Sequence, residues 1–287
     1  MRRQDIAVTS LYWLGYSTVR QVVFRALRRP VAVFVTFHDV EPPAREDFAA
    51  NLAFLKARTN VVGIDDFFGG RLSTERINVV ITFDDGYRSW ITHAVPLLRQ
   101  LDLPATFFVS SGFVGLAEPS SREFMRSNLR LAPDPSGARG GLTETDLRSM
   151  AAQGFTIGGH TVSHCNLETV ADRDQLLSEI EEDRSRLQVI TGSRIEYFAY
   201  PFGACRHPRF DLPGIVRDCG YRGAVTTESG FNETGTHRFL LHRELTPAAM
   251  HRWAFRARTF GNYEAVRVIK RRLGMISRPA PDGRAPG

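Results

Sequence analysis

Residues 77–87 of this chain read INVVITFDDGY, an apolar run that ends in two adjacent aspartates, a glycine and a tyrosine. The run is rich in β-branched residues and has the length of an ordinary strand, so it predicts a buried strand. Similar short runs recur along the chain at 31–37, 105–110, 154–159, 195–200 and 221–227. Strands that are apolar on both faces are typical of parallel sheets.

The segments between these runs have helical patterns, and they are 45–58, 89–101, 143–153, 173–191 and 208–219. Alternating strands and helices predict an α/β fold with one parallel sheet and helices outside it, either closed as a barrel or open and doubly wound. Residues 112–142 are rich in Pro, Gly and Ser, which predicts a long loop with one short helix.

The chain has 287 residues and is 43% hydrophobic, enough for one large core, which we expect over residues 30–250 as a catalytic domain. Basic residues mark a predicted C-terminal helix at 251–276. Residues 277–287 lack core-forming side chains, which predicts a disordered tail. The three cysteines have no CxxC spacing, which argues against a thiolate metal site. No RNA-binding or zinc-finger motif occurs, so no nucleic-acid partner is expected.

Residues 1–29 predict a basic amphipathic helix, because an apolar stripe lies among several arginines. Such a helix could dock on an anionic membrane surface or pack on its own domain, and the pattern leaves both open. The segment carries no cleavage site typical of a signal peptide, and no uncharged run reaches about 18 residues. We therefore expect a cytoplasmic protein, peripheral on the inner face of the membrane if the helix docks there.

The aspartates at the end of the run 77–87 are the strongest chemical signal. Two adjacent carboxylates at a buried strand end repel each other and lose hydration unless a cation compensates. Neighbouring side chains leave a strand in different directions, so one of Asp84 and Asp85 can bind a metal while the other faces the substrate as a base. The alternative is a simple turn in which Asp85 caps the following helix.

Two histidines, His160 and His164, follow the predicted strand at 154–159. Their four-residue spacing would bring both imidazoles to one side of a helical turn. Two histidines and one carboxylate leave open positions on a zinc-like ion, as hydrolysis requires. Zinc is the expected ion, although these residue types also accept cobalt, nickel or manganese.

These motifs resemble the polysaccharide deacetylase family, also called the NodB-homology or carbohydrate esterase 4 family, over roughly residues 31–245. The family's TFDDGY motif stands at 82–87 and its H[ST]xxH motif at 160–164. The resemblance implies a distorted (β/α) barrel in which Asp84 is the general base. It also implies that Asp85, His160 and His164 bind the metal.

The family's third motif resembles Tyr200, Pro201, Phe202 and Gly203 here, in the form of the exopolysaccharide-associated branch. The arginine that orients the base in this motif is missing. By resemblance, the backbone N–H of Phe202 helps bind the oxyanion, and Tyr200 and Pro201 line the substrate site. Taken without the resemblance, the segment is a tight turn that closes a strand.

The family's last motif supplies a histidine as general acid, and Leu240, Leu241 and His242 match it. Arg243 occupies that place in a shifted alignment and is the alternative at the acid position. The aspartate motif that tunes the histidine in the family has no counterpart. His38 and Asp39 end the first predicted strand and are expected to line the pocket.

The resemblance predicts a metal-dependent hydrolase that removes N-acetyl groups from the amino sugars of a polysaccharide or glycan precursor. An esterase that removes O-acetyl groups with the same site is the second interpretation. A sugar-binding barrel without activity is the third, and it would normally lack one of Asp84, Asp85, His160 and His164, all of which are present.

Overall fold

The computed structural model describes residues 22, 26, 28–131 and 139–260. A single sheet organises them, with strand order β7–β6–β5–β4–β3–β1–β8 and β2 beside β3, and every strand pair is parallel. The strands are β1 (Ala32–Phe37), β2 (Asn60–Val61), β3 (Asn78–Asp85), β4 (Thr106–Val109), β5 (Thr156–Gly159), β6 (Tyr197–Ala199), β7 (Gly223–Val225) and β8 (Glu244–Leu245).

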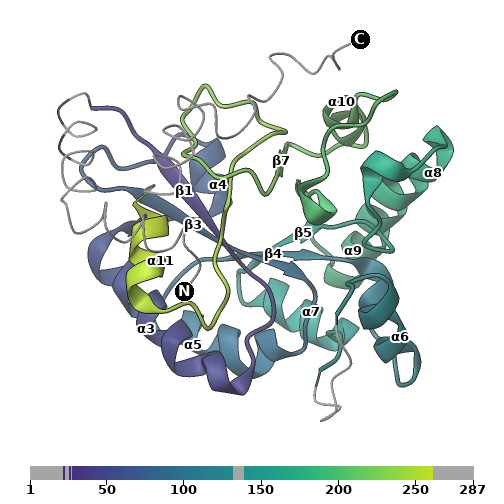
Figure 1. Cartoon of the computed structure of the whole chain (residues 1–287), viewed down its shortest axis with the longest axis horizontal. Coiled ribbons are helices and arrows are strands. Elements are labelled where there is room, and N and C mark those ends of the chain that lie inside the picture. Colours follow the sequence, from purple (N-terminus) through teal and green to yellow (C-terminus); the bar gives the residue numbers. More distant parts are fainter. Residues whose placement is uncertain (1–21, 23–25, 27, 132–138, 261–287) are drawn as a thin grey trace, which may run out of the picture.

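The two edges of this sheet are joined by the segment that leads into β8 (Figure 1). Leu241 forms a parallel bridge with Val225 of β7. A few residues later, Glu244 pairs with Val35 of β1. The sheet therefore curls back on itself, and the predicted distorted (β/α) barrel is confirmed.

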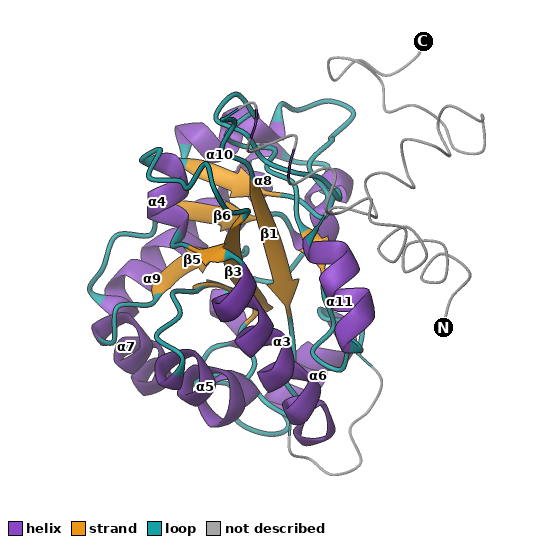
Figure 2. Cartoon of the chain, turned by 90° about the vertical axis from the view of Figure 1, so that its left-hand side faces the viewer, coloured by secondary structure: helices purple, strands orange, loops and turns teal. Residues whose placement is uncertain are grey.

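Helices cover the outside of the curled sheet, as the side view shows (Figure 2). The α-helices are α3 (Arg45–Arg58), α4 (Ile64–Phe68), α5 (Val95–Gln100), α6 (Ser120–Ser127), α7 (Glu144–Ala152), α8 (Arg173–Leu177), α9 (Asp183–Thr191), α10 (Leu212–Asp218) and α11 (Arg252–Thr259). The 3₁₀ turns are η1 (Pro42–Ala44), η3 (Ser111–Phe113), η4 (Leu167–Thr169) and η6 (Pro201–Gly203), and the π-helical turns are η2 (Trp90–Ala94) and η5 (Ser178–Glu182).

The predicted helix at 45–58 is found with the same bounds, and the one at 173–191 is found as the continuous run α8–η5–α9. The sequence did not predict α4, β2 and β8. The two strands have two residues each, too few to show a periodic pattern.

Side chains alternate between two apolar layers along the strands, as pleated strands require. One layer fills the barrel and includes Phe34, Val80 and Leu241. The other lies between sheet and helices, where the rings of Phe83 and Phe107 stack with centroids 4.7 Å apart. Asp84 lies on the same face of β3 as Val80, so the inner layer forms the floor beneath it.

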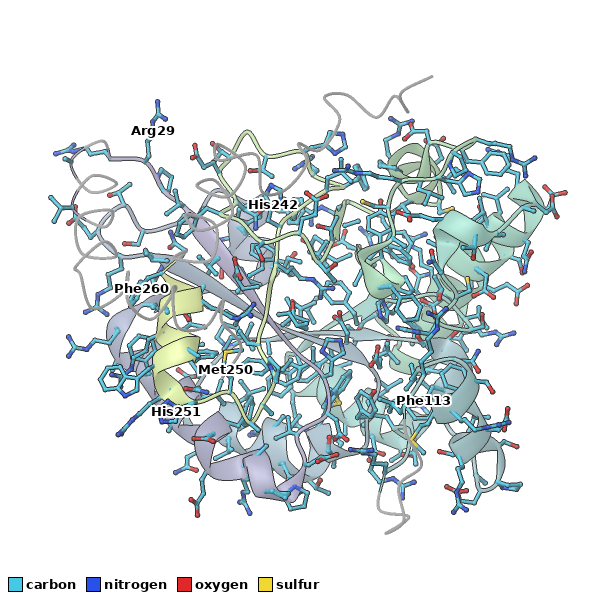
Figure 3. All side chains as sticks on the ribbon, in the orientation of Figure 1. Arg29, Phe113, His242, Met250, His251 and Phe260 are labelled. Atoms are coloured by element: carbon cyan, nitrogen blue, oxygen red, sulfur yellow. The ribbon has the colours of Figure 1, made fainter. Side chains whose placement is uncertain are left out.

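Helix α11 lies beside α3, between the labelled His251 and Phe260 of Figure 3. The Asn51 side chain of α3 donates a hydrogen bond to the Met250 carbonyl over 2.9 Å. The rest of the predicted C-terminal helix and tail (261–287) and nearly all of the predicted N-terminal helix (1–29) lie outside the described residues. Among the residues that the structure describes, no helix is long and apolar enough to cross a membrane.

We expect Gly112→Ala to lower both the stability and the metal affinity of the protein. The Gly112 N–H bonds the Val162 carbonyl over 2.9 Å, and a Cβ at this position would lie 2.4 Å from that oxygen. Because the obstacle is backbone, relief requires movement of the turn between His160 and His164, and overpacking of this kind costs about 1–3 kcal/mol. Urea unfolding and zinc titration measure the two effects. Gly235→Ala is the control, since its Cβ would meet open space, and equal behaviour of the two variants would contradict the prediction.

Candidate active site

The end of β3 sends its two aspartates in different directions. Asp84 continues the inward alternation of the strand and is 2% exposed, while Asp85 has a φ of 91°. A positive φ is uncommon for a residue other than glycine and turns the chain sharply. As a result, Asp84 meets the closing segment of the barrel, and Asp85 meets the loop that follows β5.

Asp84 forms a bidentate ion pair with Arg243. Nη1 donates to Oδ1 and Nη2 to Oδ2, each over 2.6 Å. A third bond runs from Nε of Arg243 to the Thr226 carbonyl over 2.8 Å. Burial raises the pKa of Asp84, but the guanidinium charge lowers it by more, so the pKa lies below its ordinary value. Asp84 is therefore an ionised, oriented acceptor.

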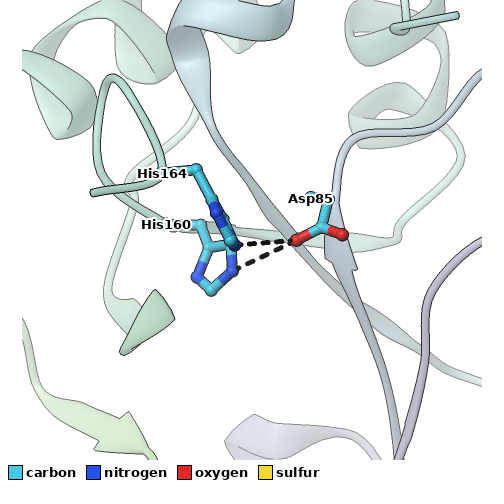
Figure 4. Close-up of side chains that lie close together, drawn as sticks. All are labelled: Asp85, His160 and His164. Atoms are coloured by element: carbon cyan, nitrogen blue, oxygen red, sulfur yellow. Dashed lines mark ion pairs between the residues drawn. The ribbon is translucent and has the colours of Figure 1, made fainter. Parts of the chain in front are cut away.

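Asp85, His160 and His164 meet at one point (Figure 4). Oδ1 of Asp85 lies 3.4 Å from Nε2 of His160 and 3.2 Å from Nε2 of His164. One ligand atom from each of the three residues falls within a 4.8 Å spread, and all three side chains are buried. The structure thus brings together the three residues that the sequence predicts as metal ligands.

Hydrogen bonds on the far side of each imidazole support this arrangement as a metal site. Nδ1 of His160 lies 2.6 Å from the Ala199 carbonyl, and Nδ1 of His164 lies 3.1 Å from the Asn128 carbonyl. A carbonyl can only accept, so we assign the proton to Nδ1 in both rings, which leaves the Nε2 lone pairs facing the Asp85 carboxylate. Three electron-pair donors in a buried place fit a divalent cation.

The electrostatics of the cluster point the same way. Burial raises the pKa of Asp85, but bonds from protonated imidazoles would outweigh it and hold the pKa well below its ordinary value. Burial lowers the pKa of His164, but the Asp85 carboxylate raises it by more, so the pKa lies above its ordinary value. Both directions show that this cluster attracts positive charge, whether as protons or as a metal ion.

The two histidines are not on a helical turn, so that part of the sequence prediction is wrong. The loop 160–164 contains two left-handed residues, Thr161 with φ 65° and His164 with φ 53°. Glu179 holds the loop in this shape through Ser163, whose N–H donates over 2.9 Å and whose hydroxyl donates over 2.7 Å. A loop fixed by a carboxylate, rather than helical periodicity, brings the imidazoles together.

Asp183 supports the site from below and was not predicted from the sequence. Its carboxylate accepts the Ser111 N–H and the His160 N–H, each over 2.8 Å. These bonds connect the chain after β4 to the chain after β5. Burial raises the pKa of Asp183 to about 7, although the two N–H bonds oppose it. The sequence offered no signal, because Asp183 stands among other acids on a polar helix.

The other predicted residues fall into two groups, those beside the ligands and those away from them. The Phe202 ring lies against His164, with centroids 4.7 Å apart, and positive charge on His38 would lower the pKa of Asp84 and of Asp85. Asp39 is held by Arg139 over 3.0 Å.

Pro201 and Tyr200 are buried. The Tyr200 ring packs on Phe198 in the outer core, so the structure does not bring it to the metal ligands.

The closing segment brings Arg243, and not His242, to Asp84. The His242 N–H donates to Oδ1 of Asn232, and Nδ2 of Asn232 donates to the His242 carbonyl, each over 2.8 Å. The His242 ring, labelled in Figure 3, lines a cavity of about 220 Å³ together with Cys205, Arg206 and His237. The third motif lacks the arginine that the family carries there, and Arg243 instead binds Asp84 from the last motif. A guanidinium bound in this way cannot also serve as the acid.

We expect His160→Ala and His164→Ala each to abolish tight zinc binding, because two donors remain where a hydrolytic site needs three. Equilibrium dialysis followed by metal analysis measures the effect. His237→Ala provides the matched control, since this residue lies outside the ligand cluster. A full equivalent of tightly bound zinc in both variants would rule out the cluster as the metal site.

We expect Arg243→Met to destabilise the protein by about 3–5 kcal/mol at neutral pH, because it leaves a buried carboxylate without its partner. The double variant Asp84→Asn/Arg243→Met should recover most of this loss, and urea unfolding measures both.

The pH dependence of that stability should also change sign. In the native chain the lowered pKa of Asp84 stabilises the fold above the unfolded carboxyl pKa, and this stabilisation is lost as the pH falls. Without Arg243, burial raises the Asp84 pKa, so stability falls as the pH rises from acid to neutral. An Arg243→Met variant with native stability and native pH dependence would show that the pair is dispensable.

Residues 71–224 match the polysaccharide deacetylase family. The chain is 27% identical over 179 residues to YxkH of Bacillus subtilis (strain 168), a protein named for this same family, covering 62% of this chain and 55% of YxkH. It is 30% identical over 129 residues to a chitin deacetylase of Colletotrichum lindemuthianum, covering 44% of this chain and 42% of that protein. The chain thus spans about half the length of these relatives.

Solved structures share the fold. IcaB from Ammonifex degensii has a TM-score of 0.64 at 23% identity, over 81% of this chain and 97% of that one. The Streptococcus pyogenes deacetylase PplD, solved in complex with acetate, has a TM-score of 0.63 at 19% identity, over 80% of this chain and 99% of that one. Identities this low establish the architecture alone. The family match covers more than half of the chain, and the chain therefore belongs to the polysaccharide deacetylase family.

Proposed function

We propose that this protein is a metal-dependent hydrolase that removes N-acetyl groups from amino sugars of a polysaccharide or glycan precursor and releases acetate. The observation that carries the proposal is the pairing of Asp84 with Arg243 directly beside the ligand cluster. A hydrolase that activates water needs an ionised proton acceptor beside a bound cation, and here Asp84 lies beside three groups that can ligate one. The family to which the chain belongs supports deacetylation as the reaction.

Asp85, His160 and His164 would hold the divalent metal, which when bound polarises the acetyl carbonyl and makes a neighbouring water more acidic. Zinc suits this donor set best, although cobalt, nickel and manganese also accept it. The two backbone carbonyls behind the imidazoles keep Nε2 of each ring directed at the metal position. The protein therefore orients its ligands before the ion arrives.

Asp84 accepts the proton of the attacking water, and Arg243 keeps it ionised and correctly aimed until then. The backbone N–H of Phe202 donates to the oxyanion that forms from the acetyl oxygen. Its φ of 58° belongs to a tight turn that directs the peptide away from β6, and such donors act because they are oriented in advance. The protonated Asp84 can then return its proton to the leaving amine, which balances the reaction with one carboxyl group.

The same groups would also cleave an O-acetyl ester, so this activity is the second candidate. Acetate release from a panel of N-acetylated and O-acetylated glycans, with metal-stripped protein as the control, separates the two. Release from neither class by metal-loaded protein would refute the proposed hydrolase and favour a sugar-binding barrel.

We expect Asp84→Asn to retain fold and metal, at lower stability because the buried Arg243 loses its charged partner, and to lose at least about 100-fold in turnover, because the amide cannot accept the proton. Acetate release per bound metal is the measurement. Asp218→Asn is the control, since Asp218 pairs with Arg217 at the surface. Near-native turnover by a fully metal-loaded Asp84→Asn variant would remove Asp84 from the role of base.

A further inference from the structure

The segment that follows α6 forms one wall of the ligand cluster. The Asn128 carbonyl faces Nδ1 of His164, and the Asn128 side chain donates to the Ser163 carbonyl over 2.7 Å. Leu129 is buried, and its N–H bonds the Phe124 carbonyl over 3.2 Å. The wall is therefore pinned both to the histidine loop and to its own helix.

Arg130 leaves this wall toward solvent and lies over Phe202. It has a φ of 55°, a left-handed conformation that turns its side chain away from the buried Leu129. Its guanidinium carbon lies 4.6 Å from the centre of the Phe202 ring. Phe202 is 41% exposed, and its ring also meets His164 edge to face, with an interplanar angle of 69°. Arg130, Phe202 and His164 thus form a row of contacts from the surface to the ligand cluster.

Acidic groups at the site already have partners, but Arg130 does not face one. Asp84 binds Arg243, Asp39 binds Arg139, and Asp85 faces the two imidazoles. Within residues 28–131 and 139–260, no carboxylate forms an ion pair with Arg130. The guanidinium carbon lies over the Phe202 ring, and an arginine in such a cation–π contact can still bind a carboxylate or phosphate through two parallel N–H bonds.

We propose that Arg130 and Phe202 form a binding subsite for an anionic group of the glycan substrate, and that the enzyme prefers acidic glycans over neutral ones. Because this row of contacts ends on His164, the group belongs to the acetylated sugar or to the one next to it. Phe202 positions the guanidinium beside the ligand cluster, and the guanidinium supplies the charge. The shared chemistry is an oxyanion, which can be the carboxylate of a uronic acid or the phosphate of a sugar phosphate. This inference rests on the proposed function.

The test compares kcat/KM for acetate release from three N-acetylated substrates: a neutral oligosaccharide, its counterpart with a uronic acid beside the acetylated sugar, and a phosphorylated counterpart. We expect the native enzyme to prefer an anionic substrate by about 10-fold or more, mainly through KM, since bonds to a charged group are the stronger class. The better of the two anionic substrates identifies the source of the charge. The preference should shrink as salt is added.

Arg130→Gln should remove the preference, and Arg130→Lys should retain only part of it, because lysine keeps the charge and loses the planar fork. Arg126→Gln is the matched control on the preceding helix α6, where Arg126 is paired with Glu123, and it should keep the native preference. An equal preference in the native enzyme and in Arg130→Gln, or none in the native enzyme, overturns the inference.

A binding measurement separates this inference from the proposed function. Isothermal titration calorimetry measures the binding of two probes, a non-acetylated oligouronate and a sugar phosphate, and requires no turnover. The proteins compared are native, Arg130→Gln and Arg126→Gln. No acetate release from any substrate counts against the proposed function alone. Anion binding that Arg130→Gln weakens about 10-fold still supports the subsite, and binding that is absent or unchanged by the substitution overturns it.

Discussion

The buried ion pair between Asp84 and Arg243 connects the chemistry of the site to the closure of the barrel. Asp84 stands at the end of β3, and Arg243 stands in the segment that joins the two edges of the sheet. Removing two charges from water is costly unless each finds a partner in good geometry. Asp84 and Arg243 reach that geometry only when the sheet has curled. The buried ion pair and the closure of the barrel therefore depend on each other.

Left-handed residues at the ends of the strands convert this barrel into a site. Asp85, Thr161, His164 and Phe202 all have positive φ, although none is a glycine. Such conformations persist when surrounding bonds over-determine them, and they concentrate at functional sites. Here Glu179 fixes the histidine loop, and Asp183 fixes the chain on either side of it. Glu179 and Asp183, which are not part of the ligand cluster, are therefore as important for the shape of the site as Asp85, which is.

The sequence predicted the parallel sheet and the meeting of the ligand residues because both follow local rules, whereas the closure into a barrel was implied by the family resemblance. All strands except the two-residue β2 and β8 lie in short apolar runs, and the polar residues that follow parallel strands meet at one face. The partner of Asp84 could not be found in this way, since Arg243 lies 159 residues further along the chain and its neighbour His242 matched the family's motif better. Asp183 was hidden for another reason: in a helix rich in acids, periodicity does not show which carboxylate is buried.

In the reaction proposed above, Arg243 would also determine how well one carboxyl group can both accept and deliver a proton. By lowering the pKa of Asp84 it weakens the base that must take a proton from water, and it strengthens the acid that must give that proton to the amine. The first effect is tolerable only if another group makes the water more acidic, and a divalent metal held by Asp85, His160 and His164 would do so. The second effect suits amide cleavage, because an amine leaves only after it is protonated. The ion pair and the ligand cluster would thus act together, with a single carboxyl group moving the proton in both directions.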